Sequence, residues 1–181
     1  MLTAAQAWKM LDEADLVCPA AEVDHAIEQV AGAITAEFRD RYPLVLCVMN
    51  GALFFCARLL PLLRFPLHLD YVHASRYGDG IDGRQVHWRV EPGDAVRARH
   101  VLVVDDILDA GDTLATIKAK VLERGAASCK VAVLTDKIKP DRKPITPDFL
   151  GLRIPDRFVF GCGLDAHGLW RNLPAIYALK Q

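Results

Sequence analysis

The stretch VLVVDDILDAGDTLATIKAKV, residues 101–121, decides the expected fold. It begins with four apolar and mostly β-branched residues, a pattern typical of a strand that is buried on both faces. Two carboxylates, Asp105 and Asp106, follow at once. After two more apolar residues comes segment 109–113, a short turn that contains a glycine. The stretch therefore predicts a buried strand, an acidic edge and a tight loop.

The residues after this turn have the pattern of a helix. Four apolar side chains recur at helical spacing, and a glycine stands where a C-terminal cap would end the helix. These residues are Leu114, Ile117, Val121 and Leu122, with Gly125 as the cap.

This order of elements predicts a phosphate site beside a hydroxyl site. A loop that enters a helix presents N–H groups and the positive end of the helix dipole, so it can bind phosphate without a basic side chain. Carboxylates at the C-terminal end of a buried parallel strand lie where open α/β sheets bind ligands. They can accept hydrogen bonds from vicinal hydroxyls or help to hold a metal. The expected ligand is a ribose 5-phosphate.

Residues 103–114, VVDDILDAGDTL, resemble the phosphoribosyl-diphosphate (PRPP) signature of type I phosphoribosyltransferases, in the form typical of the 6-oxopurine enzymes. The resemblance implies that Asp105 and Asp106 hold the ribose hydroxyls and that loop 109–113 wraps the 5′-phosphate. It makes Asp109 the catalytic residue, near N7 of the purine, whereas Asp112 must direct its charge away from the phosphate. The expected PRPP-binding residues are Asp105, Asp106, Asp109, Ala110, Gly111, Asp112 and Thr113.

A different reading of the same stretch stays open. A strand that ends in two acids also occurs in receiver-type domains of doubly wound folds, and a glycine loop before a helix is common in α/β proteins. The remaining segments of the chain must therefore decide between the two.

Length and composition restrict the alternatives. The chain has 181 residues, enough for one domain with a full core. Its net charge of −1 argues against nucleic acid as the main partner. Five cysteines without close pairing predict buried free thiols and a reducing compartment. With no signal peptide and no long apolar span, we expect a cytoplasmic protein without membrane contact.

A second turn after a buried strand is expected at Asn50-Gly51. The strand covers residues 44–49, and an apolar helix follows the turn, so the turn faces the ligand edge of the sheet. In the 6-oxopurine family the matching segment binds pyrophosphate through backbone amides and has a cis peptide before the position of Asn50. The family commonly has lysine where this chain has Asn50, which removes a cation. The alternative is a plain β-turn.

A polar hairpin is expected between strands at residues 67–74 and 85–90. Its tip is rich in glycine and aspartate, which cannot pack a core. By resemblance it is the lid of the active site, with Ser75, Arg76 and Tyr77 at its base. Without the resemblance it is only a polar hairpin.

The purine site is expected in the last third of the chain. Lys137 follows a buried strand at residues 129–134, and the family places there a lysine that donates to the purine 6-oxo group. The sequence PDFLGLRIPDRFVFGCGLDAHGLWRNLP, residues 147–174, matches a second family pattern. The resemblance implies that Phe158 stacks on the purine and that the backbone of Val159 reads its edge. It also implies that Arg171 contacts pyrophosphate, and that Asp165 lies near Mg²⁺ together with Asp105 and Asp106.

The resemblance covers roughly residues 20–180 and implies one α/β domain, a mostly parallel sheet flanked by helices. The expected core is about 40–140, and the expected small hood consists of about 1–20 and 145–181. The implied reaction is Mg²⁺-dependent transfer of phosphoribose from PRPP to N9 of hypoxanthine or guanine, giving IMP or GMP and pyrophosphate. A homodimer or homotetramer is expected. A xanthine-preferring enzyme and a non-catalytic nucleotide-binding regulator remain the alternatives.

Overall fold

The protein is built around a mostly parallel sheet, as predicted. The computed structural model describes residues 2–75 and 86–180. In this part of the chain, six strands form a sheet in the order β4-β3-β2-β5-β6-β7, and β4 alone is antiparallel to its neighbour. Their bounds are β2 (Leu44–Val48), β3 (His68–Ser75), β4 (His87–Val90), β5 (His100–Leu108), β6 (Ser128–Lys137) and β7 (Phe149–Ile154).

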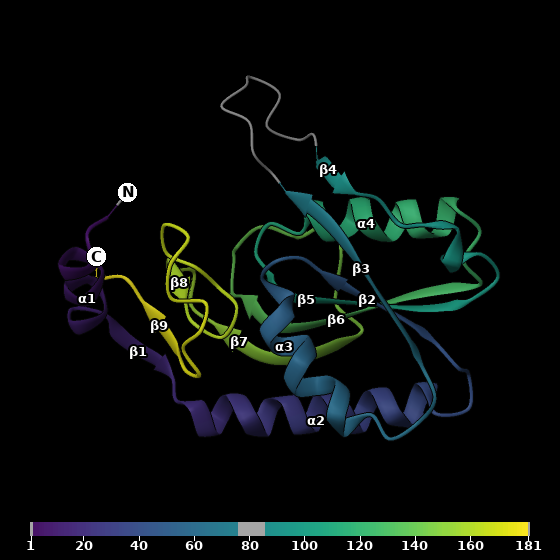
Figure 1. Ribbon diagram of the computed structural model, residues 1–181, viewed down its shortest axis with the longest axis horizontal. Coiled ribbons are helices and arrows are strands. Elements are labelled where there is room, and N and C mark those ends of the chain that lie inside the picture. Colours follow the sequence, from purple (N-terminus) through teal and green to yellow (C-terminus); the bar gives the residue numbers. More distant parts are fainter. Residues whose placement is uncertain (1, 76–85, 181) are drawn as a thin grey trace.

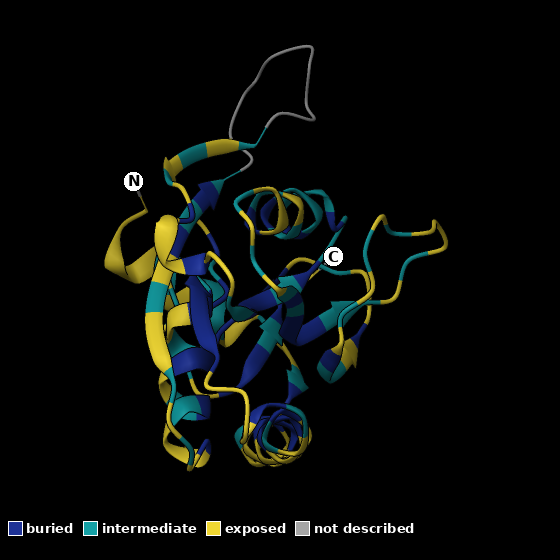
Figure 2. Cartoon of the chain, turned by 90° about the vertical axis from the view of Figure 1, so that its right-hand side faces the viewer, coloured by how far each residue is buried: buried dark blue, intermediate teal, exposed yellow. Residues whose placement is uncertain are grey.

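Helices cover both faces of this sheet. Figure 1 shows α4 (Asp112–Glu123) above the sheet and α2 (Ala20–Phe38) below it, and α3 (Ala52–Leu59) packs on the same side as α2. Buried residues gather in the sheet and on the inner sides of these helices (Figure 2). The remaining helical segments are α1 (Ala4–Asp12) and the short 3₁₀ turns η1 (Leu60–Leu62) and η2 (Asp94–Val96).

The strand β5 lies at the centre of the sheet and is longer than expected. Residues 101–104 are fully buried, as predicted. Asp105 and Asp106, expected just after the strand, instead lie within it. The reason is that β6 pairs with β5 as far as Leu108, whereas the pairing with β2 stops at Val104. The two carboxylates therefore lie beyond the end of β2 while their backbone remains in the sheet.

The helix α4 packs on the sheet through most of the predicted stripe. Leu114, Ile117 and Val121 are buried, but Leu122 is 45% exposed, so its expected place on the buried face was wrong. Successive helix positions differ by about 100°, which turns Leu122 away from the side that Val121 presents to the sheet. Gly125 has φ of +88°, a conformation that suits glycine after the last turn of a helix.

A second, smaller sheet joins the two ends of the chain. It has the order β1-β9-β8, with β1 (Asp15–Cys18), β9 (Ile176–Ala178) and β8 (Val159–Phe160). Strand β1 was not predicted, because its partner lies about 160 residues away and local periodicity cannot reveal that pairing. The segments of this sheet fall in the predicted hood, whereas β7 lies in the main sheet although its residues are beyond 145. The division into core and hood stays a prediction.

All five cysteines are buried and free, as predicted. Burial raises the pKa of Cys18 and that of Cys129 to about 11, which keeps both as thiols at neutral pH. Among residues 2–75 and 86–180, no helix combines the length and the hydrophobicity that a membrane span requires.

Candidate active site

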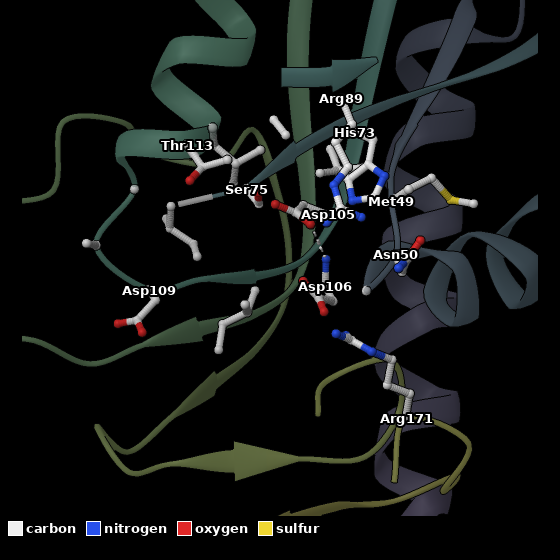
Figure 3. A pocket seen from close by; sticks show the side chains of 18 of the residues that line it. Met49, Asn50, His73, Ser75, Arg89, Asp105, Asp106, Asp109, Thr113 and Arg171 are labelled. Carbon is white, nitrogen blue, oxygen red and sulfur yellow. Dashed lines mark hydrogen bonds between the residues drawn. The ribbon is translucent and has the colours of Figure 1, made fainter. Parts of the chain in front are cut away.

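A cavity of about 630 Å³ opens at the carboxyl ends of the parallel strands. Its walls come from the end of β5 and the loop that follows, the turn between β2 and α3, and the antiparallel pair β3-β4. This is the edge at which open α/β sheets bind ligands. Figure 3 shows the side chains that line the cavity, with Asp105 and Asp106 in its middle.

The Asp105–Asp106 pair forms the floor of the cavity. The two side chains are buried, with exposed fractions of 8% and 7%, and the amide of Asp106 donates a 3.0 Å hydrogen bond to Oδ1 of Asp105. Burial, followed by the charge of Asp106, raises the pKa of Asp105 well above its usual range. Burial also raises the pKa of Asp106, while Asp105 and Arg171 act in the opposite direction. Two adjacent buried carboxylates are stabilised by a cation or by hydroxyl donors.

The predicted phosphate loop faces the same cavity. Gly111 is the N-cap residue of α4 with φ of +94°, and Asp109, Ala110, Gly111 and Thr113 all line the cavity. The first turn of a helix leaves N–H groups without intrahelical partners, which favours an anion there. Asp112 is not among the lining residues, as expected for a carboxylate that must point away from a phosphate. The loop and the acidic pair thus share one crevice.

The predicted pyrophosphate turn closes another side of the cavity. Asn50 and Gly51 both line it, and the peptide between Met49 and Asn50 is cis. A Cβ atom at Gly51 would lie 1.9 Å from Oδ2 of Asp106, so only glycine allows this turn to approach the acidic pair. Gly163 from the C-terminal segment makes a similar approach, since its Cβ would lie 2.2 Å from the carbonyl oxygen of Gly51.

Arg171 also reaches the cavity, but Asp165 does not join the acidic pair. Nη1 of Arg171 donates to the carbonyl oxygen of Gly163 at 2.6 Å, and Nη2 of the same side chain forms an ion pair with Asp165. Asp165 further accepts a 2.7 Å hydrogen bond from the amide of Gly168. In the described part of the chain, no three acidic, histidine or cysteine side chains lie close enough to hold a metal together. Asp165 therefore remains outside the predicted metal group because Arg171 and the Gly168 amide hold it.

The acidic pair nevertheless fits Mg²⁺. This ion is commonly held by one or two carboxylates, with the remaining ligands supplied by water and substrate phosphates. Asp105 and Asp106 are two such carboxylates, and burial is the main reason that the pKa of each is raised. A bound diphosphate would have to supply further oxygens.

Two lysines hold Asp109. Nζ of Lys137 lies 3.2 Å from Oδ2 of Asp109, and Nζ of Lys139 lies 2.5 Å from Oδ1. Burial alone would raise the pKa of Asp109, but the hydrogen bonds and charges of Lys139 and Lys137 outweigh it and lower that pKa. Asp109 is therefore a carboxylate at neutral pH. Both lysines also lie 3.7 Å from Asp156.

The predicted purine residues lie beside this cluster. Lys137 lines a second cavity of about 630 Å³, which shares Leu108 and Lys139 with the first. Phe158 is 56% exposed, and the Asp156 contacts bring its segment next to Lys137. Val159 is buried in β8, and neither Phe158 nor Val159 lines either cavity. The structure thus brings Lys137 to Asp109 directly and leaves the Phe158 ring available to a planar ligand.

The predicted lid is described only at its base. Ser75, the last residue of β3, lines the cavity. Arg76 and Tyr77 lie outside the described residues.

Several site residues were not anticipated from the sequence. His73, Arg89 and Lys139 line the cavity, and the hydroxyl of buried Thr135 donates to the carbonyl oxygen of Asp106 at 2.8 Å. Thr135 could have been found as a polar residue that follows the apolar run of β6. Arg89 and His73 gave no such signal, because the pairing of β3 with β4 decides which way they point.

The fold and the cavity define an open α/β protein in which an acidic pair and the N-terminus of α4 meet in one cavity at the carboxyl edge of the sheet. A family model described as "Phosphoribosyl transferase domain" matches residues 19–167. The chain is 34% identical over 160 residues to a hypoxanthine-guanine phosphoribosyltransferase of Bacillus subtilis, covering 88% of this chain and 89% of that protein. It is 34% identical over 161 residues to a hypoxanthine-guanine-xanthine phosphoribosyltransferase of Tritrichomonas foetus, covering 88% of both.

Solved structures agree with these similarities. The crystal structure of a hypoxanthine phosphoribosyltransferase from Staphylococcus aureus superposes with a TM-score of 0.86 at 27% identity, covering 95% of each chain. The protein therefore belongs to the phosphoribosyltransferase family, and its similarity is to the hypoxanthine-guanine members. This confirms the family and the fold class that residues 101–121 predicted.

Proposed function

We propose that this protein is a purine-salvage enzyme that transfers the 5-phosphoribosyl group of PRPP to N9 of hypoxanthine or guanine, giving IMP or GMP and pyrophosphate. The observation that carries this proposal is the single cavity shared by the acidic pair and the loop of Asp109 to Thr113. A ribose 5-phosphate needs hydroxyl acceptors and an anion site at a fixed separation, and this cavity offers both. The names of the similar proteins support the same substrates.

The reaction displaces diphosphate from C1′ of the ribose. In the proposed arrangement, Asp105 and Asp106 accept hydrogen bonds from the 2′- and 3′-hydroxyls and orient the sugar. The amides of loop 109–113 bind the 5′-phosphate, and the Asn50-Gly51 turn with Arg171 contacts the departing diphosphate. Fixing both ends of the substrate holds C1′ in position for attack by N9.

Asp109 is the proposed catalytic residue. Positive charge develops on the ribose as diphosphate leaves, and a proton on the purine at N7 must be accepted or shared as N9 attacks. A carboxylate near N7 can do this, and the lysines keep Asp109 ionised. Because Lys137 lies 3.2 Å from Asp109, the same lysine can also donate to the 6-oxo group of a bound base.

Mg²⁺ is the proposed cofactor. Asp105 and Asp106 would hold it together with oxygens of the substrate, and it would supply positive charge that stabilises the leaving diphosphate. Asp165, the third predicted metal residue, could contribute only if its pair with Arg171 opened.

Two further properties belong to this proposal. We expect a homodimer or homotetramer, as the resemblance implies. We expect the protein to work in the reducing cytoplasm, and the five buried free thiols support this.

One assay tests the proposed function. The purified protein is incubated with PRPP and Mg²⁺ and with hypoxanthine, guanine, xanthine or adenine, and nucleotide formation is followed by absorbance. We expect IMP and GMP to form and adenine to be left unchanged, because the ammonium of Lys137 favours a carbonyl acceptor over an amino donor. If no base is converted, the proposal is wrong and a nucleotide-binding regulator becomes the better interpretation.

A xanthine-converting activity is the second candidate. It is favoured by the 34% identity to a protein named as a hypoxanthine-guanine-xanthine phosphoribosyltransferase. The incubation with xanthine in the same assay tests this candidate, since a xanthine-converting enzyme would form XMP.

A further inference from the structure

Among the residues that the structure describes, three cationic side chains line the cavity, and two of them already have carboxylate partners. Lys139 pairs with Asp109, and Arg171 pairs with Asp165. The third is Arg89 on β4, which forms no ion pair with any residue in the described ranges 2–75 and 86–180. The charge of Arg89 is therefore available to a ligand.

A β-bulge directs Arg89 toward the cavity. In the antiparallel pair of β3 and β4, His73 is opposite Val90 and Ala74 is opposite Trp88, so Arg89 is the extra residue between these two pairs. Such a bulge reorients the side chain at that position and is common beside active sites. Arg89 and His73 consequently line the same cavity as the acidic pair.

The position of Arg89 indicates which part of the substrate it meets. In the view of Figure 3, Arg89 and His73 lie on the side of Asp105 toward Met49 and Asn50, whereas Asp109 lies on the opposite side. If the ribose lies on the acidic pair and its 5′-phosphate in loop 109–113, the group on C1′ points toward Asn50. That group is a diphosphate, and Asn50 brings no positive charge to meet it.

We infer that Arg89, oriented by the bulge in β4, is a diphosphate-binding residue that supplies the positive charge absent from the Asn50-Gly51 turn. A guanidinium binds phosphate oxygens with two parallel hydrogen bonds, which an amide side chain cannot do. This inference rests on the proposed function, since it takes PRPP and pyrophosphate as the ligands. It adds a specific binding residue from a strand that the sequence motifs do not include.

The test compares Arg89→Gln with Arg64→Gln. Arg64 is also exposed and does not line the cavity, so both variants lose one positive charge but only one loses it at the site. Affinities for pyrophosphate, PRPP and IMP are measured by calorimetry at a fixed Mg²⁺ concentration. We expect Arg89→Gln to weaken the binding of pyrophosphate and of PRPP about 10- to 100-fold, the range for a hydrogen bond between charged groups. Binding of IMP, which has no diphosphate, should not change, and Arg64→Gln should match the unmodified protein.

Either of two results would overturn the inference. One is unchanged pyrophosphate affinity in Arg89→Gln, and the other is an equal loss for IMP, which would indicate a general or structural effect. If Arg89→Gln has a lower melting temperature than the unmodified protein, the same affinities are measured for Arg89→Lys instead. Lysine keeps the charge and loses only the bidentate geometry. This variant should bind pyrophosphate more weakly than the unmodified protein, and equal affinity would again overturn the inference.

The proposed function can fail separately. A protein that forms no nucleotide but binds pyrophosphate through Arg89 would contradict the proposed reaction and leave this inference standing. A protein that forms nucleotide, and whose affinity for pyrophosphate is unchanged in Arg89→Gln, would support the proposed reaction and overturn this inference.

Discussion

At the scale of single residues, the ionisation of the Asp109 carboxyl group depends on its neighbours. Its two oxygens face Lys137 and Lys139, which lower its pKa against the effect of burial. A carboxylate held in this way remains ionised at neutral pH and can accept a proton during attack by N9. The motif identifies the aspartate, but Lys139 becomes its partner only through folding.

We predict that Asp109→Asn lowers kcat roughly 10- to 1000-fold, because the amide can neither accept the purine proton nor balance developing positive charge. Steady-state kinetics with hypoxanthine and PRPP measure this. Asp40→Asn is the control, since Asp40 is exposed just after α2 and forms an ion pair with the neighbouring Arg39. An unchanged kcat in Asp109→Asn would remove this residue from the mechanism.

Lys137 carries the expected preference for 6-oxopurines. We predict that Lys137→Ala raises KM for hypoxanthine about 10- to 100-fold, the value of a hydrogen bond from a charged donor, with a much smaller effect on KM for PRPP. Phe158→Ala should act in the same direction, since stacking on a base is worth about 1 to 3 kcal/mol. Varying one substrate at a time separates the two constants. Equal increases in both would mean that the base binds elsewhere.

At the scale of elements, the site depends on close contacts between backbone segments. The C-terminal segment around Gly163 packs on the turn between β2 and α3, and that turn packs on the acidic pair of β5. Each contact is possible because a glycine has no Cβ. The arrangement of the cavity is therefore set by segments that are far apart in the sequence.

We predict that Gly163→Ala destabilises the protein by about 1 to 3 kcal/mol, because its φ is +101° and the new Cβ would meet the carbonyl oxygen of Gly51. Thermal unfolding and nucleotide formation should both decline. The matched control is Gly32→Ala in α2, where a Cβ meets nothing within 4 Å. Alanine there should stabilise the helix by about 0.5 to 1 kcal/mol. Equal stability of the two variants would contradict the proposed role of the close contact.

At the scale of the whole molecule, exposed apolar side chains from α3 and β3 lie together on the surface. Leu53, Leu69 and Tyr71 are 47%, 56% and 48% exposed, and they surround an apolar cavity of about 540 Å³ between α3 and β3. Clustered apolar side chains on a surface favour burial against a partner. A second copy of the chain is the partner that the resemblance implies.

We predict that light scattering measures two or four times the chain mass of 20.0 kDa. Leu69→Asp should produce monomers, because a buried carboxylate without a partner is costly. Leu122→Asp is the control, since Leu122 is 45% exposed, against 56% for Leu69, but lies on α4. If the unmodified protein is a monomer, the expected oligomer is wrong. If it is an oligomer that Leu69→Asp leaves intact, the interface lies elsewhere.

The sequence by itself determined that residues 101–121 contain a strand, a loop and a helix, and it determined the family. These depend on local patterns, since apolar runs, helical spacing and a glycine turn are written in adjacent residues. Tertiary structure alone decided that β6 extends β5 past the acidic pair, that β1 joins the chain ends, and that Lys139 and Arg89 face the cavity. Each of these follows from pairing between segments that are distant along the chain, and side chains far apart in the sequence meet only when that pairing has formed.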